Sequence, residues 1–225
     1  MMMNLFSIFD PSSSMMSSLN MNWSSSFLGL IFMPSSFWMI MSRKKILFTK
    51  LINKLYKEIK ILSGKNKMNS NLLFTSLFIF ILFNNFLGLF PYIFTSTSHL
   101  TISLSLSLTL WLMNMLVGWG KHTNHMFTHL VPQNTPNSLM PFMVIIESIS
   151  NMIRPMTLAV RLTANIIAGH LLMTLMSSMG SKITMFMSIM LIFSQMLLLT
   201  LEYAVSIIQA YVFMTLITLY SSEVK

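Results

Sequence analysis

The chain contains no cysteine and few charged residues. Only 8% of its 225 residues are Asp, Glu, Lys or Arg, and only five residues are acidic. Soluble domains carry about 25% charged residues, so this chain has too few charges to cover a globular surface in water. The absence of cysteine excludes a disulfide framework and thiolate chemistry. With 54% hydrophobic residues, the composition predicts an integral membrane protein built as one bundle of helices.

Basic residues are concentrated in one segment. Nine of the 14 Lys and Arg residues lie between Arg43 and Lys67, and the net charge is +9. A basic cluster beside apolar segments is typical of a membrane-surface segment, so we expect no nucleic-acid partner. Residues 1–22 contain no basic residue and therefore do not resemble a secretory signal or a transit peptide.

Five apolar stretches approach or exceed the roughly 20 residues that a membrane crossing needs. They predict an all-α membrane protein with helices over 22–41, 72–94, 100–119, 141–177 and 185–220. The first is the weakest because Pro34 interrupts it. Residues 104–108 alternate like a strand, but a lone strand in lipid would leave its backbone unpaired, so we expect a helix there.

The last two stretches are longer than one crossing needs. Each would be roughly 50–55 Å long as a helix, whereas the hydrocarbon core is about 30 Å thick. We expect two steeply tilted, antiparallel helices, joined by a turn at 177–181, with Pro155 as the place for a kink in the first.

Residues 46–62 have apolar and basic residues on opposite sides of a helix. The pattern predicts an amphipathic helix on the bilayer surface, with a solvated connector as the alternative. If this basic segment lies on the inner side, five crossings place the N-terminus outside, Lys121 and Lys225 inside, and Lys182 outside. No internal repeat typical of inverted-repeat transporters is found.

Charged residues lie inside the two long apolar stretches. They are Glu147, Arg154, Arg161, His170 and Glu202. A charge at the bilayer centre costs at least about 2.5–3.5 kcal/mol, so such residues face a partner, an aqueous cavity or an ion path. The alternative is a structural ion pair that holds two helices together.

The spacing of polar residues predicts two seams. One would contain Glu147, Asn151, Arg154, Leu158, Arg161 and Asn165, and the other Gln195, Glu202, Ser206 and Gln209, with Glu223 close to it. Two facing seams in lipid make a route for protons or other cations. His170 points roughly the opposite way from Arg161.

Other chemistry has little support. His122, His125 and His129 share a helical face, but no carboxylate or thiolate lies near them in the sequence to complete a metal site. The chain has no serine elbow, HExxH motif or phosphate loop, so we expect no metal, cofactor or hydrolase activity.

The segment 161–170, Arg-Leu-Thr-Ala-Asn-Ile-Ile-Ala-Gly-His, resembles the core motif of the subunit a family of F-type ATP synthases, in particular its mitochondrial form. Further segments fit the same family, namely 85–92, 139–142, 145–150, 201–202 and 208–213. The composition, rich in Met and Asn, suits an invertebrate mitochondrial gene product.

The resemblance implies a role for several residues. Arg161 matches the essential stator arginine that faces the carboxylates of a rotating c-ring. The other matching positions line two half-channels: His170 and Glu202 on the intermembrane-space side, Glu147 and Glu223 on the matrix side, and Asn165 and Gln209 beside the arginine. Family members often have another polar residue at Arg154, so the resemblance does not imply that Arg154 is essential.

The resemblance also implies partners and a location. The partners are the c-ring, other membrane-sector and peripheral-stalk subunits, the lipid bilayer and protons. The location is the mitochondrial inner membrane, with the N-terminus in the intermembrane space and the C-terminus in the matrix. ATP chemistry would reside in other subunits. A cation/proton transporter, a respiratory-complex membrane subunit and a purely structural membrane subunit are the competing hypotheses.

Overall fold

The computed structural model describes residues 5–12, 21–34, 40–64, 68–121, 123–131, 136, 138–180 and 184–223, and none of these residues lies in a strand. The α-helices are α1 (Ser25–Ile31), α2 (Arg43–Ser63), α3 (Met68–Gly88), α4 (Leu100–Lys121), α5 (Thr123–Leu130), α6 (Met140–Met179) and α7 (Met185–Glu223). Short 3-10 helices cover Leu5–Phe9, Met21–Ser24 and Ser96–Ser98. The predicted all-α fold is confirmed. The alternating segment 104–108 lies within α4, since a helix pairs its backbone groups internally.

Four helices, α3, α4, α6 and α7, are long and apolar enough to cross a membrane. The chain is therefore a multi-pass membrane protein. With 40 and 39 residues, α6 and α7 are each about 60 Å long, twice the thickness of a typical hydrocarbon core.

The first predicted helix, 22–41, is shorter in the structure. Within it, α1 contains seven residues and ends at Ile31, so its length is about 10 Å and too short for a crossing. Pro34 explains the ending, because it lacks a backbone N–H and disfavours helical geometry in the preceding residue. Residues 35–39 lie outside the described part of the chain.

The second predicted helix, 72–94, begins earlier and ends at Gly88. Beyond it, Pro91 cannot continue a helix, and Tyr92 takes a left-handed φ of 69°. Gly88 fits the turn closely, because a methyl group on it would lie 2.9 Å from Cγ2 of Thr95.

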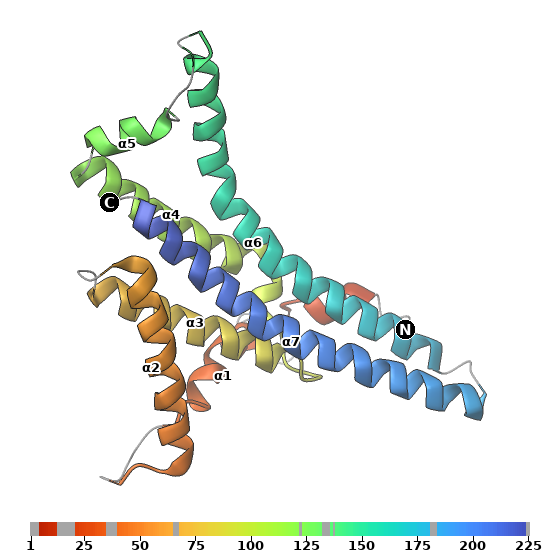
Figure 1. Ribbon diagram of the computed structural model, residues 1–225. Coiled ribbons are helices and arrows are strands. Elements are labelled where there is room, and N and C mark those ends of the chain that lie inside the picture. The colour runs from red at the N-terminus through yellow and green to blue at the C-terminus, as the bar shows by residue number, and fades with distance from the viewer. Residues whose placement is uncertain are drawn as a thin grey trace.

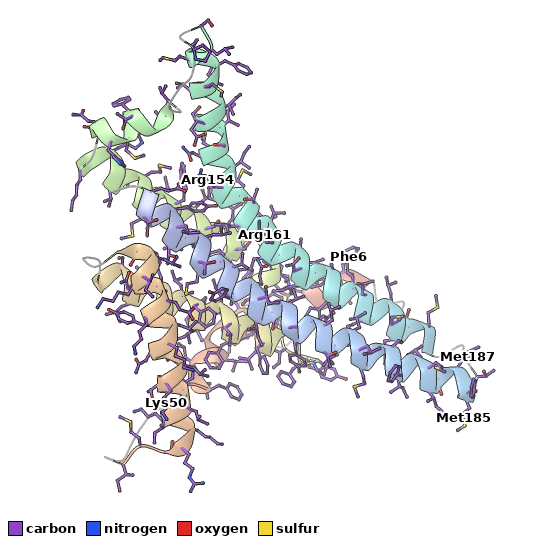
Figure 2. The ribbon with its side chains drawn as sticks, viewed as in Figure 1. Phe6, Lys50, Arg154, Arg161, Met185 and Met187 are labelled. Atoms are coloured by element: carbon purple, nitrogen blue, oxygen red, sulfur yellow. The ribbon has the colours of Figure 1, made fainter. Side chains whose placement is uncertain are left out.

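The predicted amphipathic segment 46–62 lies within α2. The Ser42 side chain caps this helix by accepting a hydrogen bond from the backbone N–H of Lys45. One face packs on α3, where the Phe48 and Phe83 ring centroids are 6.3 Å apart. Lys50 is exposed, away from that contact (Figure 2).

The two long helices run side by side only in part (Figure 1). The second half of α6 lies along α7, whereas the first half bends away from it. Pro155 lies inside α6 and explains the bend, because a proline removes one backbone hydrogen bond and its ring clashes with the preceding turn. The predicted kink is confirmed.

The core lies where α3 packs against α7 and α4 packs against α6 (Figure 1). Its buried apolar residues include Ile81, Leu110, Leu158, Leu162 and Phe213. Small polar residues are buried beside them, which lets helix backbones approach closely in a membrane protein. On α6, the core residues Leu158 and Leu162 lie between Arg154 and His170 in the sequence.

Candidate functional site

Arg154 is the centre of a charged cluster near the bend of α6 (Figure 2). One guanidinium nitrogen lies 2.6 Å from Oε2 of Glu223 on α7, and another lies 3.8 Å from Oε1 of Glu147 on α6. The guanidinium carbon also lies 5.0 Å from the ring centroid of Tyr220, a cation–π distance. The cluster therefore connects the diverging ends of the two long helices.

This cluster borders a cavity of about 70 Å³, which Asn114 and Asn151 also line. Such a volume holds about two water molecules. The side chains of Arg154, Glu147 and Glu223 are 31%, 34% and 52% exposed, so the chain encloses this ion-pair cluster only in part.

Arg161 lies two helical turns beyond Arg154 and has a different environment (Figure 2). Its side chain is exposed, and it forms no ion pair with any residue that the structure describes. A fixed charge without an internal partner is costly in a membrane-spanning helix. Among the described residues, Arg161 has no counter-ion, and its side chain lies open on the surface of α6.

Asn165 and Gln209 connect α6 to α7 one turn beyond Arg161. The Asn165 side-chain amide donates a hydrogen bond of 3.1 Å to Oε1 of Gln209, and Gln209 is only 5% exposed. This pair confirms that the two predicted polar sets meet at this level of the helix pair.

A second cavity, of about 230 Å³, begins at this pair. Glu202, Ser206 and Gln209 of α7 line it, together with Asn85 of α3 and Gly169 of α6. Three of these residues have buried polar atoms without a hydrogen-bond partner in the described part of the chain: both amide atoms of Asn85, Oε1 of Glu202 and Nε2 of Gln209. Buried polar groups are normally satisfied by protein or water, and the volume holds several water molecules, so this cavity is suited to water.

His170 follows Gly169 but packs elsewhere. Its ring contacts Phe9 edge-on, with the centroids 6.1 Å apart, and its buried Nε2 has no hydrogen-bond partner among the described residues. Glu202 reaches the preceding residue, because a methyl group on Gly169 would lie 2.6 Å from its Oε1. The structure therefore places the carboxylate of Glu202, on α7, against Gly169 of α6, the residue before His170, with no hydrogen bond between Glu202 and His170.

The single seam predicted along residues 147–165 is wrong. Glu147, Asn151 and Arg154 line the first cavity, and Asn165 lines the second, but Leu158 between them is 3% exposed and belongs to the hydrophobic core. The bend at Pro155 and this buried leucine separate the two sites. Glu223 also belongs to the Arg154 cluster and not to the Glu202 seam.

One residue of these sites, Asn85, was not predicted to take part, although it was detectable as a member of an Asn-Asn pair in the apolar helix α3. Arg154 was predicted as a charge inside an apolar stretch and as a member of the polar seam. Of the three loop histidines, His122 and the His129 side chain lie outside the described residues. In the described part of the chain, no group of three or more side chains could hold a metal ion.

Long membrane-spanning helices that carry an ion-pair cluster, an exposed arginine and a cavity bordered by unpaired polar atoms define an integral membrane protein with polar sites within its helix bundle. The ATP synthase A chain family matches residues 30–222. ATP synthase subunit a of Locusta migratoria and that of Aedes aegypti are each 60% identical to this chain, and that of Drosophila yakuba is 59% identical, with all of both chains covered in each case. The chain belongs to the ATP synthase A chain family, as its motifs predicted, and these three relatives are from insects.

Proposed function

We propose that this chain is the non-catalytic stator subunit that carries protons through the membrane sector of an F-type ATP synthase, in the mitochondrial inner membrane. The contrast between two arginines of α6 carries the proposal. Arg154 has its counter-ions within the chain, at 2.6 and 3.8 Å. Arg161 has none among the described residues and is exposed, so it is available to the carboxylates of a c-ring.

The chemistry of arginine suits this role. Arginine stays protonated in proteins, so Arg161 is a fixed positive charge. A neutral carboxyl group can cross lipid, whereas an ionised one cannot do so cheaply. Arg161 favours the ionised form of a c-ring carboxyl that comes near it. At about 4 Å the attraction is on the order of 4 kcal/mol for an effective dielectric constant near 20, enough to release a proton without trapping the rotor.

The two cavities support two half-channels on either side of Arg161. The cavity at Glu202 and Gln209, with His170 beside it, would deliver protons from the intermembrane space. The cluster of Glu147 and Glu223 would release them to the matrix. Arg161 lies between the two half-channels and prevents a proton from passing directly from one to the other. Each proton must therefore move with the ring. Each proton gains about 2.3 kcal/mol per 100 mV of membrane potential.

The distribution of basic residues supports an orientation. With basic α2 on the matrix side, α3 crosses outward, α4 returns to end at Lys121, α6 crosses outward, and α7 returns so that the C-terminus is in the matrix. The 3-10 helix Leu5–Phe9 contacts α6 at His170, which supports an N-terminus in the intermembrane space.

ATP-driven proton pumping in inverted inner-membrane vesicles tests the proposal. At matched assembly of the synthase, Arg161→Ala should abolish pumping. Arg161→Lys should also fail, because a compact ammonium is hydrated differently and can lose its proton. Lys50→Ala, which removes an exposed charge on α2, is the control and should pump normally. Normal pumping by Arg161→Ala would mean that the buried charges serve another transport process or only the structure.

A further inference from the structure

We propose that Arg154 is a positioning residue of the matrix-side proton path, which anchors Glu223 and leaves Glu147 free to exchange protons. The inference rests on the proposed function of this site as a half-channel. It concerns a residue for which the family resemblance implies no essential role.

The two carboxylates are held unequally. Glu223 lies 2.6 Å from the guanidinium and accepts a hydrogen bond from it, whereas Glu147 lies 3.8 Å from it with no such bond. Charge-assisted hydrogen bonds at the shorter distance are the strong ones. One guanidinium beside two carboxylates also leaves one negative charge uncompensated, and Glu147 is the more loosely held of the two carboxylates.

The position of Arg154 explains why an anchor is needed. Pro155 follows it directly, and the first half of α6 bends away from α7 there (Figure 1). Arg154 spans the diverging helices by binding Glu223 and lying over Tyr220, both on α7. These three charged side chains border a cavity and are 31–52% exposed, so the chain does not seal the cluster inside its helix bundle.

Removing the guanidinium would leave two carboxylates close together without a counter-ion. Neighbouring carboxylates disfavour each other's ionisation, and loss of an opposite charge does the same. The cluster would then hold its proton more tightly. In ATP-driven pumping, where protons enter from the matrix face, transfer of that proton from the cluster to the ring would slow. Removing the Glu223 charge at the same time would relieve this effect, whereas removing the Glu147 charge would not, because Glu147 carries the proton.

The test is the dependence of pumping on external pH in inverted vesicles, whose outer face is the matrix face. All variants retain Arg161 and are compared at equal assembly. Arg154→Gln should lower the pumping rate and move the acid limb of the profile upward. Arg154→Lys should restore part of the rate. Arg154→Gln with Glu223→Gln should return the profile toward that of the wild type, and Arg154→Gln with Glu147→Gln should not.

An unchanged rate and profile in Arg154→Gln would overturn the inference, as would a lower rate with an unmoved profile, which indicates a structural pair only. Equal rescue by Glu223→Gln and Glu147→Gln would overturn the division of roles. These outcomes are separable from a failure of the proposed function, because that failure requires normal pumping by Arg161→Ala.

Discussion

Gly169 leaves the space that the carboxylate of Glu202 occupies. A methyl group on Gly169 would lie 2.6 Å from Oε1 and 2.9 Å from Cδ of Glu202, closer than packed atoms approach. The residue after Gly169 is His170, so this clearance also brings the carboxylate of α7 to the level of the imidazole on α6. Because Gly169 has no side chain, the carboxylate of Glu202 can approach α6 this closely.

Gly169→Ala should displace the Glu202 carboxylate and lower the rate of ATP-driven proton pumping at matched assembly. Alanine favours a helix over glycine by about 1 kcal/mol, so the loss would not come from weaker helix formation. Gly120→Ala is the control, because a methyl group there meets no atom within 4 Å. Equal pumping by the two variants would show that the position of Glu202 does not limit proton transfer.

The hydrogen bond between Asn165 and Gln209 should act as one unit. Asn165→Leu and Gln209→Leu each remove the same 3.1 Å bond, so the double variant should lose little more pumping than either single one. A double-mutant cycle of pumping rates should give an interaction free energy of about 0.5–1.5 kcal/mol, the usual contribution of a hydrogen bond. Strictly additive losses would contradict a shared role.

Much of the fold could be predicted because lipid restricts the choices. The length of the apolar stretches predicted the four long helices, and Pro155 predicted the bend in α6. The charges in apolar segments marked both sites, because such residues are costly in lipid. The predicted helix over 22–41 was too long. The prediction followed its apolar composition, although Pro34 interrupts the segment.

The pairing of the charged residues could not be predicted. Arg154 and Glu223 are 69 positions apart, and their contact depends on how α7 crosses α6 beyond the bend. Helical spacing placed Leu158 on the same stripe as the charges, but the bend and packing against α4 and α7 bury it. Periodicity describes one straight helix and contains no information about its neighbours.

Asn84 and Asn85 are a second example of residues whose surroundings could not be predicted from the sequence. Both are buried in α3, at 6% and 3% exposure, and both have amide atoms without a hydrogen-bond partner. Only Asn85 lines the cavity that contains Glu202 and Gln209. Neighbouring residues on a helix point about 100° apart, so the packing of α3 decides which of the two reaches the cavity.

This difference makes a matched pair of substitutions possible. Asn85→Leu removes two buried polar atoms of a residue that lines the cavity and should lower the rate of ATP-driven proton pumping. Asn84→Leu makes the same chemical change one residue earlier and should leave pumping unchanged. Each substitution replaces a buried polar group by an apolar one of similar size, which is nearly neutral or stabilising when the group lacks a partner. Equal assembly of the two variants would therefore attribute a difference in pumping to the cavity, whereas equal pumping would show that proton transfer does not depend on water at Asn85.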